Sequence, residues 1–210
     1  MLTQRPALTV DNTRRPWRYM LGSTGLWGVT DVLRDHGFIN PEWCSEVARE
    51  RGRAVHLATA YADQGRLEWN SLHQALHGYV HGWQDMNRRM GWRVLDCEVP
   101  RHHAVYGFGG QLDRRMADPA GTEWVVDIKT VGPGGSAPKS AAYQTAAYDL
   151  LLPRVPPGAR ARRRAAVELH PDGKARLVEH TDFADAGFFL AFLSTTKRRH
   201  HHGVIDGPAA

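Results

Sequence analysis

The hydrophobic period of the sequence changes at Gly91, and this change constrains the fold more than any other feature. Before Gly91, apolar residues recur at steps of three and four, as on one face of an amphipathic helix. After it, apolar and polar residues alternate in short runs bounded by turn-forming residues, as in β-strands. Helices that lead into consecutive strands and then return to helices predict an α/β fold, built on a small mixed β-sheet flanked by helices.

The same patterns place the individual elements. Helical patterns cover residues 22–38 after a short turn, 41–65, 71–90, 139–152 and 182–199. Strand patterns cover residues 92–100, 102–118 and 122–131, and a hairpin of 165–170 with 174–180. We expect Thr30 or Asp31 to cap the first helix. One stripe of the second helix should contain Trp43, Val47, Arg51 and Val55. Residues 1–20 predict a polar N-terminal arm, 21–199 a single domain, and 200–210 a flexible tail.

Charge and cysteine content narrow the classes of protein. Lys and Arg total 27 against 22 Asp and Glu, which gives a net charge of +5 and suits a polyanionic partner. Cys44 and Cys97 are the only cysteines, so a four-cysteine zinc or iron–sulfur site cannot form within one chain. No apolar run reaches the length of a signal peptide core or a membrane span. We therefore expect a cytoplasmic protein with no membrane contact.

An Asp-x-Lys sequence ends the strand EWVVDIKT, residues 123–130. Asp127 and Lys129 point to the same face of that strand, because alternate side chains share a face. A surface ion pair of little energetic weight is one interpretation. The other starts from Asp113, 14 residues earlier on the preceding strand, which a hairpin can bring beside Asp127. Two adjacent carboxylates need a cation, and Mg²⁺ or Mn²⁺ would leave Lys129 to serve water or a phosphate.

The order of three short motifs resembles the PD-(D/E)XK nuclease superfamily, specifically its RecB-like exonuclease branch. The motifs are GGQLDR with Asp113, VVDIKT with Asp127 and Lys129, and AAYQTAAY with Gln144 and Tyr148. The resemblance spans about residues 25–150 and implies a restriction-endonuclease-like core. It also implies that Gln144 and Tyr148 shape the site and contact nucleic acid. Relatives with an iron–sulfur cluster hold it with four cysteines, so no cluster is expected here.

The resemblance also implies a set of metal ligands. His56 in RGRAVH matches the family's upstream histidine and would bind metal together with Asp113, Asp127 and the backbone carbonyl of Ile128. A helix histidine is otherwise more often a solvated or hydrogen-bonded residue. Glu98 in DCEVP resembles a glutamate that opens the first core strand in relatives. It would contact metal or water, or serve as an ordinary polar strand residue.

The implied activity is a Mg²⁺- or Mn²⁺-dependent deoxyribonuclease, most simply a DNA exonuclease of recombination or repair encoded by a phage or mobile element. DNA would be its substrate, and a single-strand annealing or recombination protein is one partner that fits. Two alternatives stay open. The chain could be a recombination-accessory module that binds DNA without cutting it, or a DNA endonuclease. Polarity, strand preference, metal stoichiometry and oligomeric state are not fixed by the sequence.

Three further groups of side chains have both a functional and an ordinary interpretation. Arginines and lysines in two clusters could contact phosphates or form solvated faces: Arg160, Arg162, Arg163, Arg164, Lys197, Arg198 and Arg199. Tryptophans could stack on unpaired bases or lie in the core: Trp17, Trp27 and Trp43. Histidines at four-residue spacing favour a solvated helix face over a zinc site: His73, His77 and His81. The HHH run at 200–202 belongs to the expected tail.

Overall fold

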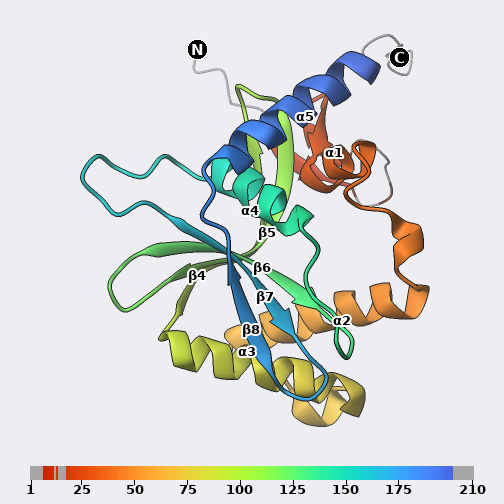
Figure 1. Ribbon diagram of the computed structural model, residues 1–210, viewed down its shortest axis with the longest axis vertical. Helices are drawn as coiled ribbons and strands as arrows, with labels where there is room; N and C mark the ends of the chain where they lie inside the picture. The colour runs from red at the N-terminus through yellow and green to blue at the C-terminus, as the bar shows by residue number, and fades with distance from the viewer. Residues whose placement is uncertain (1–6, 12, 14–17, 201–210) are drawn as a thin grey trace.

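A mixed β-sheet with helices on both faces forms the protein in the computed structural model, which describes residues 7–11, 13 and 18–200 (Figure 1). The strands of this part of the chain are β1 (Leu8–Val10), β2 (Tyr19–Leu21), β3 (Thr24–Gly28), β4 (Arg93–His103), β5 (Phe108–Ala117), β6 (Glu123–Thr130), β7 (Arg163–Leu169) and β8 (Ala175–Glu179). The α-helices are α1 (Val29–Asp35), α2 (Glu46–Asp63), α3 (His77–Met90), α4 (Ser140–Leu150) and α5 (Ala184–His200). Short 3-10 helices cover Pro41–Trp43, Trp69–Ser71 and Gln74–Leu76. The predicted fold class, a small mixed sheet flanked by helices, is confirmed.

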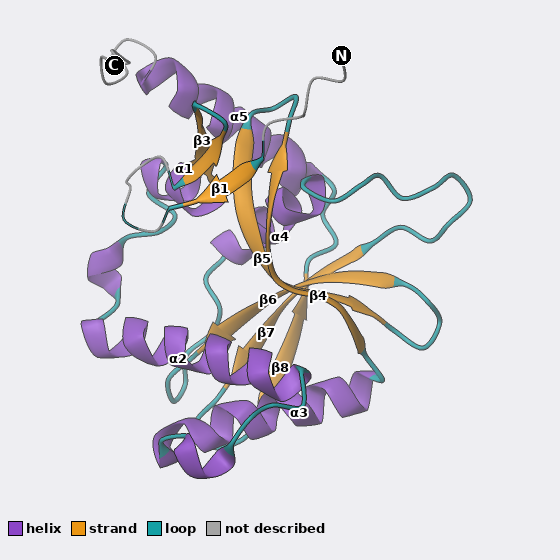
Figure 2. Cartoon of the chain, turned by 180° about the vertical axis from the view of Figure 1, so that it is seen from behind, coloured by secondary structure: helices purple, strands orange, loops and turns teal. Residues whose placement is uncertain are grey.

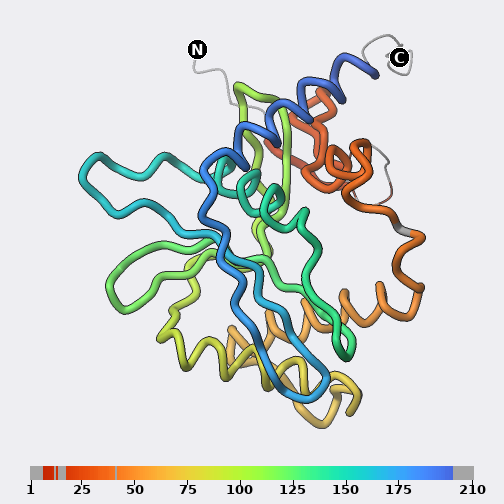
Figure 3. The backbone as a smooth tube through the Cα atoms, in the orientation of Figure 1, coloured from red at the N-terminus to blue at the C-terminus, as the bar shows by residue number. Residues whose placement is uncertain are grey.

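Strand β5 joins the two parts of the sheet. The strand order is β1-β2-β3-β5-β6-β7-β8, and β4 pairs with β5 in addition. The β3–β5 and β6–β7 pairs are parallel, and the other neighbours are antiparallel. Figure 2 shows β5 curving from the group that contains β1 and β3 into the group of β6, β7 and β8. The tube in Figure 3 follows the same path and shows α2 and α3 together on one side of the second group.

Two apolar cores lie on opposite faces of β6. Trp124, Val126 and Ile128 pack into the core beneath α2 and α3, together with Val55 and Trp83. The intervening Val125 packs into the other core, where α1, α4 and α5 contribute the residues Leu33, Tyr148 and Phe189 among others. Alternation along a strand buried on both faces therefore sends Asp127 and Lys129 to the face that α4 covers.

Strands β5 and β6 separate where the candidate site begins. Their antiparallel pairing joins residues 114–117 to 123–126, whereas β6 stays paired with β7 as far as Thr130. On its other side β5 pairs with β4 along its whole length, and toward its N-terminal end β3 takes the place of β6. Asp113 stands at the point of separation, and its Oδ2 accepts a hydrogen bond from the backbone N–H of Ile128 at 2.7 Å. The side chain of Asp113 thus satisfies a backbone amide of β6 that the backbone of β5 no longer reaches.

Several predicted boundaries need correction. The described part of the expected N-terminal arm contributes β1 and the start of β2 to the sheet. Tyr19 is 4% exposed, and a Cβ added to Gly109 would meet its ring at 2.8 Å, so this segment packs closely on β5. The helix expected over 71–90 begins at His77, after two 3-10 turns. Except for His200, the last residue of α5, the expected tail lies outside the described residues.

Two expectations about the first helices are wrong. Helix α1 begins at Val29 after the extended Gly28, so Gly28, and neither Thr30 nor Asp31, occupies the cap position. Trp43 and Val47 do not share a buried stripe with Val55, because they are 68% and 70% exposed. Within the described residues, no helix is both long and apolar enough to cross a membrane.

Candidate functional site

Helix α2 carries His56 to the point where β5 and β6 separate. The helix begins after Ser45, whose hydroxyl accepts a hydrogen bond from the N–H of Ala48 at 3.2 Å. Its inner face buries Val55 and Thr59 against the sheet. His56 then donates from Nε2 to the backbone carbonyl of Ile128 at 3.0 Å, although 72 residues separate the two in sequence. This bond fixes the ring orientation and leaves Nδ1 facing away from β6.

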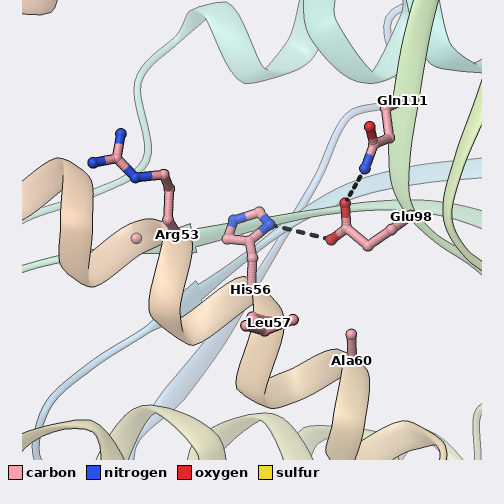
Figure 4. Close-up of a pocket in the computed structure, with 7 residues that line it drawn as sticks. Arg53, His56, Leu57, Ala60, Glu98 and Gln111 are labelled. Carbon is pink, nitrogen blue, oxygen red and sulfur yellow. Dashed lines mark hydrogen bonds and ion pairs between the residues drawn. The ribbon is translucent and has the colours of Figure 1, made fainter. Parts of the chain in front are cut away.

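Nδ1 of His56 faces two carboxylates. It lies 3.5 Å from Oε1 of Glu98 and 3.6 Å from Oδ1 of Asp113. Glu98 and Asp113 are opposite each other between the Cys97–Arg114 and Val99–Leu112 pairs of β4 and β5. One ligand atom from each of the three residues lies within 4.8 Å of the other two. Figure 4 shows His56 and Glu98 pointing toward one another.

The charges of this cluster change its pKa values. Burial by itself lowers the pKa of His56, but the charges of Asp113 and Glu98 outweigh burial and raise it to about 9. Burial raises the pKa of Asp113 to about 6, against the opposing charge of His56. Burial also raises the pKa of Glu98, but contact with His56 brings it below the usual value. At neutral pH the cluster therefore consists of a cationic imidazole between carboxylates.

A second chain of polar contacts runs from Asp127 to helix α4. Nζ of Lys129 lies 2.7 Å from Oδ2 of Asp127 and donates to Oε1 of Gln144 at 3.0 Å. Nε2 of Gln144 donates in turn to the hydroxyl of Tyr148 at 2.9 Å. Burial lowers the pKa of Lys129, but Asp127 and Asp113 outweigh it and raise the pKa above the usual value. Lys129 is therefore a cationic donor rather than a base at neutral pH.

Asp127 is a buried carboxylate with few polar contacts, as expected of a residue that binds a cation. It is completely buried; its Oδ2 contacts Nζ of Lys129 at 2.7 Å, whereas its Oδ1 has no hydrogen-bond donor among the described residues. A buried carboxylate normally accepts several hydrogen bonds or contacts a metal ion, because losing its hydration is costly. The nearby donor set of one imidazole and several carboxylates suits Mg²⁺ or Mn²⁺. The residues present therefore fit a divalent metal ion.

An open cavity gives access to this cluster. It has a volume of about 690 Å³. Its lining, drawn in Figure 4, consists of Gly52, Arg53, His56, Leu57, Ala60, Glu98 and Gln111. Among these, Gln111 donates to Oε2 of Glu98 at 2.9 Å, so the carboxylate that faces the cavity is held from two sides.

Comparisons with known proteins leave the family open. No family model matches the sequence, and no curated protein matches it. A solved structure described as "Crystal structure of SSO0001" aligns with a TM-score of 0.39 and 16% sequence identity, covering 81% of this chain and 84% of that chain. A likeness at this level assigns no function to the chain.

The ligand group differs in part from the predicted one. His56 and Asp113 come together as expected, and Glu98, left open by the sequence, joins them. Asp127 is not a member of that three-residue group in the described part of the chain, although its charge acts on Asp113. The carbonyl of Ile128, expected to bind metal, accepts the hydrogen bond from His56. The sequence analysis did not identify Gln111 or Arg114, and the position of Arg114 directly after Asp113 was the available signal.

The basic loop before β7 is largely engaged within the chain. Arg162 was expected to contact phosphate, but its side chain is 6% exposed and pairs with Glu123 and Asp149. We therefore correct its role to a structural one. Arg163 pairs with Glu179 and keeps 46% of its side chain exposed. Arg164 is buried against Asp185 and two backbone carbonyls. Arg163 and Arg164 therefore belong to the start of β7 and not to the loop before it.

The remaining aromatic and histidine candidates are dispersed. Trp27 lies in the core, Trp43 is exposed, and Trp17 lies outside the described residues. His81 stacks on Trp69 with ring centroids 4.4 Å apart. Of the other histidines in that stripe, His73 caps a 3-10 turn, and His77 donates to the carbonyl of Leu72. In the C-terminal cluster, Lys197 donates to a backbone carbonyl and Arg199 pairs with Asp35.

Proposed function

We propose that the chain is a Mg²⁺- or Mn²⁺-dependent deoxyribonuclease of the PD-(D/E)XK type, related to the RecB-like branch. Its reaction would be hydrolysis of phosphodiester bonds from DNA ends, in recombination or repair. The observation that carries the proposal is Asp127, a completely buried carboxylate whose Oδ1 has no hydrogen-bond donor among the described residues and whose Oδ2 contacts the cationic Lys129. A stabilising surface ion pair would not place these groups at the separation of two central strands.

The residues of the candidate site would have two roles, metal binding and stabilisation of negative charge. His56, Glu98 and Asp113 would hold the ion, and Asp127 is a further carboxylate available to it. A bound divalent ion supplies a Lewis acid for the phosphate and lowers the pKa of water. Lys129 would donate to the attacking water or to a phosphate oxygen and stabilise the negative charge that develops as water adds to phosphorus.

Helix α4 would aim the lysine. The carbonyl oxygen of Gln144 accepts one of the three N–H groups of Lys129, which restricts where the other two point. Tyr148 in turn holds the amide of Gln144. Because burial raises the pKa of Tyr148 well above its usual value, its hydroxyl remains protonated. The water or phosphate would therefore meet an oriented ammonium group when the P–O bond breaks.

Digestion of labelled DNA tests this function. End-labelled linear duplex and single-stranded DNA should disappear with Mg²⁺ or Mn²⁺ and persist with chelator. Lys129→Ala should keep the fold and DNA binding but cut at least about 100-fold more slowly, the usual cost of removing one charge-stabilising donor. Lys174→Ala is the matched control, because Lys174 is 81% exposed on the β7–β8 turn. Unchanged turnover in Lys129→Ala would contradict the proposed nuclease function.

Closed circular DNA separates the alternatives. An exonuclease needs an end and leaves this substrate intact, whereas an endonuclease opens it. Metal-dependent binding with no cleavage of any DNA would favour the accessory module instead.

A further inference from the structure

Arg114 is an arginine sealed inside the protein next to the candidate metal ligands. Its side chain is 0% exposed, and every one of its three guanidinium nitrogens donates a hydrogen bond. Nε donates to Oδ2 of Asp63 at 2.6 Å, and one terminal nitrogen donates to the hydroxyl of Thr59 at 3.1 Å. The guanidinium also lies 5.5 Å from the ring centroid of Trp83. These contacts tie the side chain to α2 and α3.

The remaining nitrogen of Arg114 reaches into the site itself. It donates to Oε1 of Glu98 at 3.2 Å and to the backbone carbonyl of Asp113 at 2.7 Å. Both acceptors belong to residues of the candidate ligand group. One rigid, planar group therefore connects helices α2 and α3 to two ligand candidates. A buried ion pair with Asp63 would need only part of this arrangement, since Nε alone satisfies it.

Glu98 needs such a restraint because of its backbone. It is the one described non-glycine residue with positive φ, at 52°, in a strand where extended conformations are the norm. This backbone conformation is unfavourable in free energy by itself, and it persists only when surrounding contacts enforce it. The contacts in question are Arg114 on Oε1 and Gln111 on Oε2. Glu98 and Gln111 thus line the cavity that His56 also lines, whereas Arg114 holds Glu98 from the interior.

We propose that Arg114 is a positioning residue that fixes Glu98, and through it the affinity of the site for a divalent metal ion. This proposal rests on the proposed function only in taking His56, Glu98 and Asp113 as metal ligands. Arg114 would touch neither the ion nor the DNA. It would act by holding the carboxylate of Glu98 and the backbone of Asp113 at the spacing a single ion requires, as partners of metal ligands commonly do.

Manganese titration followed by electron paramagnetic resonance tests the proposal without DNA or turnover. The test variant is the double substitution Asp63→Asn with Arg114→Gln, which removes both charges together so that neither is buried alone. Its dissociation constant for Mn²⁺ should be at least about tenfold weaker than that of the parent protein. The matched control is Glu123→Gln with Arg162→Gln, which removes another largely buried pair, away from the ligand group. Its affinity should stay within about twofold of the parent value.

A Glu98→Gln background separates positioning from general support of the fold. If Arg114 acts through Glu98, the double substitution should weaken Mn²⁺ binding much less in that background than in the parent. Equal weakening in both backgrounds, or an unchanged dissociation constant in the parent background, overturns the proposal. If the double variant does not fold, Asp63→Asn alone serves, because it replaces the charge-assisted bond from Nε by a weaker neutral one and should weaken binding severalfold only when Glu98 is present.

The Mn²⁺ titration and the nuclease assay test the two proposals separately. Metal-dependent cleavage by the parent, together with unchanged Mn²⁺ affinity in the Arg114 variant, overturns the role of Arg114 alone. A parent protein whose Mn²⁺ affinity depends on Glu98 and Arg114 but which cuts no DNA supports the positioning role and overturns the proposed nuclease function.

Discussion

Binding of a divalent metal ion should release a proton from His56, so that the apparent affinity rises with pH. The pKa of His56 is raised from 6.5 to about 9, which makes the imidazole a cation in the protein without metal. A histidine must lose that proton before its nitrogen can bind an ion. About 1% of the protein has a neutral His56 at pH 7 and about 10% at pH 8. The apparent dissociation constant should therefore fall about tenfold per pH unit, worth about 1.4 kcal/mol, until the pH approaches 9.

Calorimetry measures both the affinity and the proton. Mg²⁺ or Mn²⁺ would be titrated at pH 6.5, 7.5 and 8.5, each in two buffers with different ionisation enthalpies. Between the first and last pH the affinity should improve about 100-fold. At pH 7.5 the difference between the buffers should correspond to about one proton released for each ion bound.

The same linkage predicts how stability responds to pH. Because the folded pKa of His56 is raised, its cation stabilises the fold fully below about pH 6.5, and this contribution is lost as the pH rises through about 9. Bound metal should offset that loss, so the stabilisation by metal grows with pH. His56→Gln should bind metal more weakly and with a flat pH profile over the same range. A parent affinity that stays constant from pH 6.5 to 8.5 would refute the reasoning.

Two further predictions concern the packing that supports α2 and α3, with stability measured by urea denaturation. Gly78→Ala should destabilise the fold by about 3 kcal/mol, because the new Cβ would lie 1.9 Å from the carbonyl oxygen of Pro171. Its control, Gly187→Ala in α5, meets nothing within 4 Å and should stabilise by about 0.5–1 kcal/mol; equal midpoints for the two would contradict the close approach. Ser45→Ala removes the cap of α2 and should cost about 1 kcal/mol, and an unchanged midpoint would show that the cap bond to Ala48 is not maintained.

The sequence predicted those parts of the fold whose signals are local. The alternating strand around Asp127, the hairpin between β5 and β6, and the compact helix α4 each follow from patterns within about ten residues. The shared face of Asp127 and Lys129 followed from strand geometry, and their ion pair at 2.7 Å confirms it. The spacing of Gln144 and Tyr148 likewise predicted one helical face, and the hydrogen bond between them confirms that.

The features that could not be predicted depend on contacts between distant segments. Strands β1 and β2 have three residues each, too few for a periodic signal, and their place in the sheet depends on packing of Tyr19 on β5. The positive φ of Glu98 is a response to its surroundings, not a preference of glutamate. Arg162 appeared to be part of a basic loop, because its partners Glu123 and Asp149 lie 39 and 13 residues away.

The separation of β5 and β6 also decides when during synthesis the site can exist. A chain that has emerged only through β5 already contains His56, Glu98 and Asp113, but it lacks the amide of Ile128 that holds Asp113 and the carbonyl that orients His56. Lys129 gains its orienting partner later still, when α4 has been made. Incomplete or truncated chains therefore lack an assembled site, which forms only when folding is nearly finished.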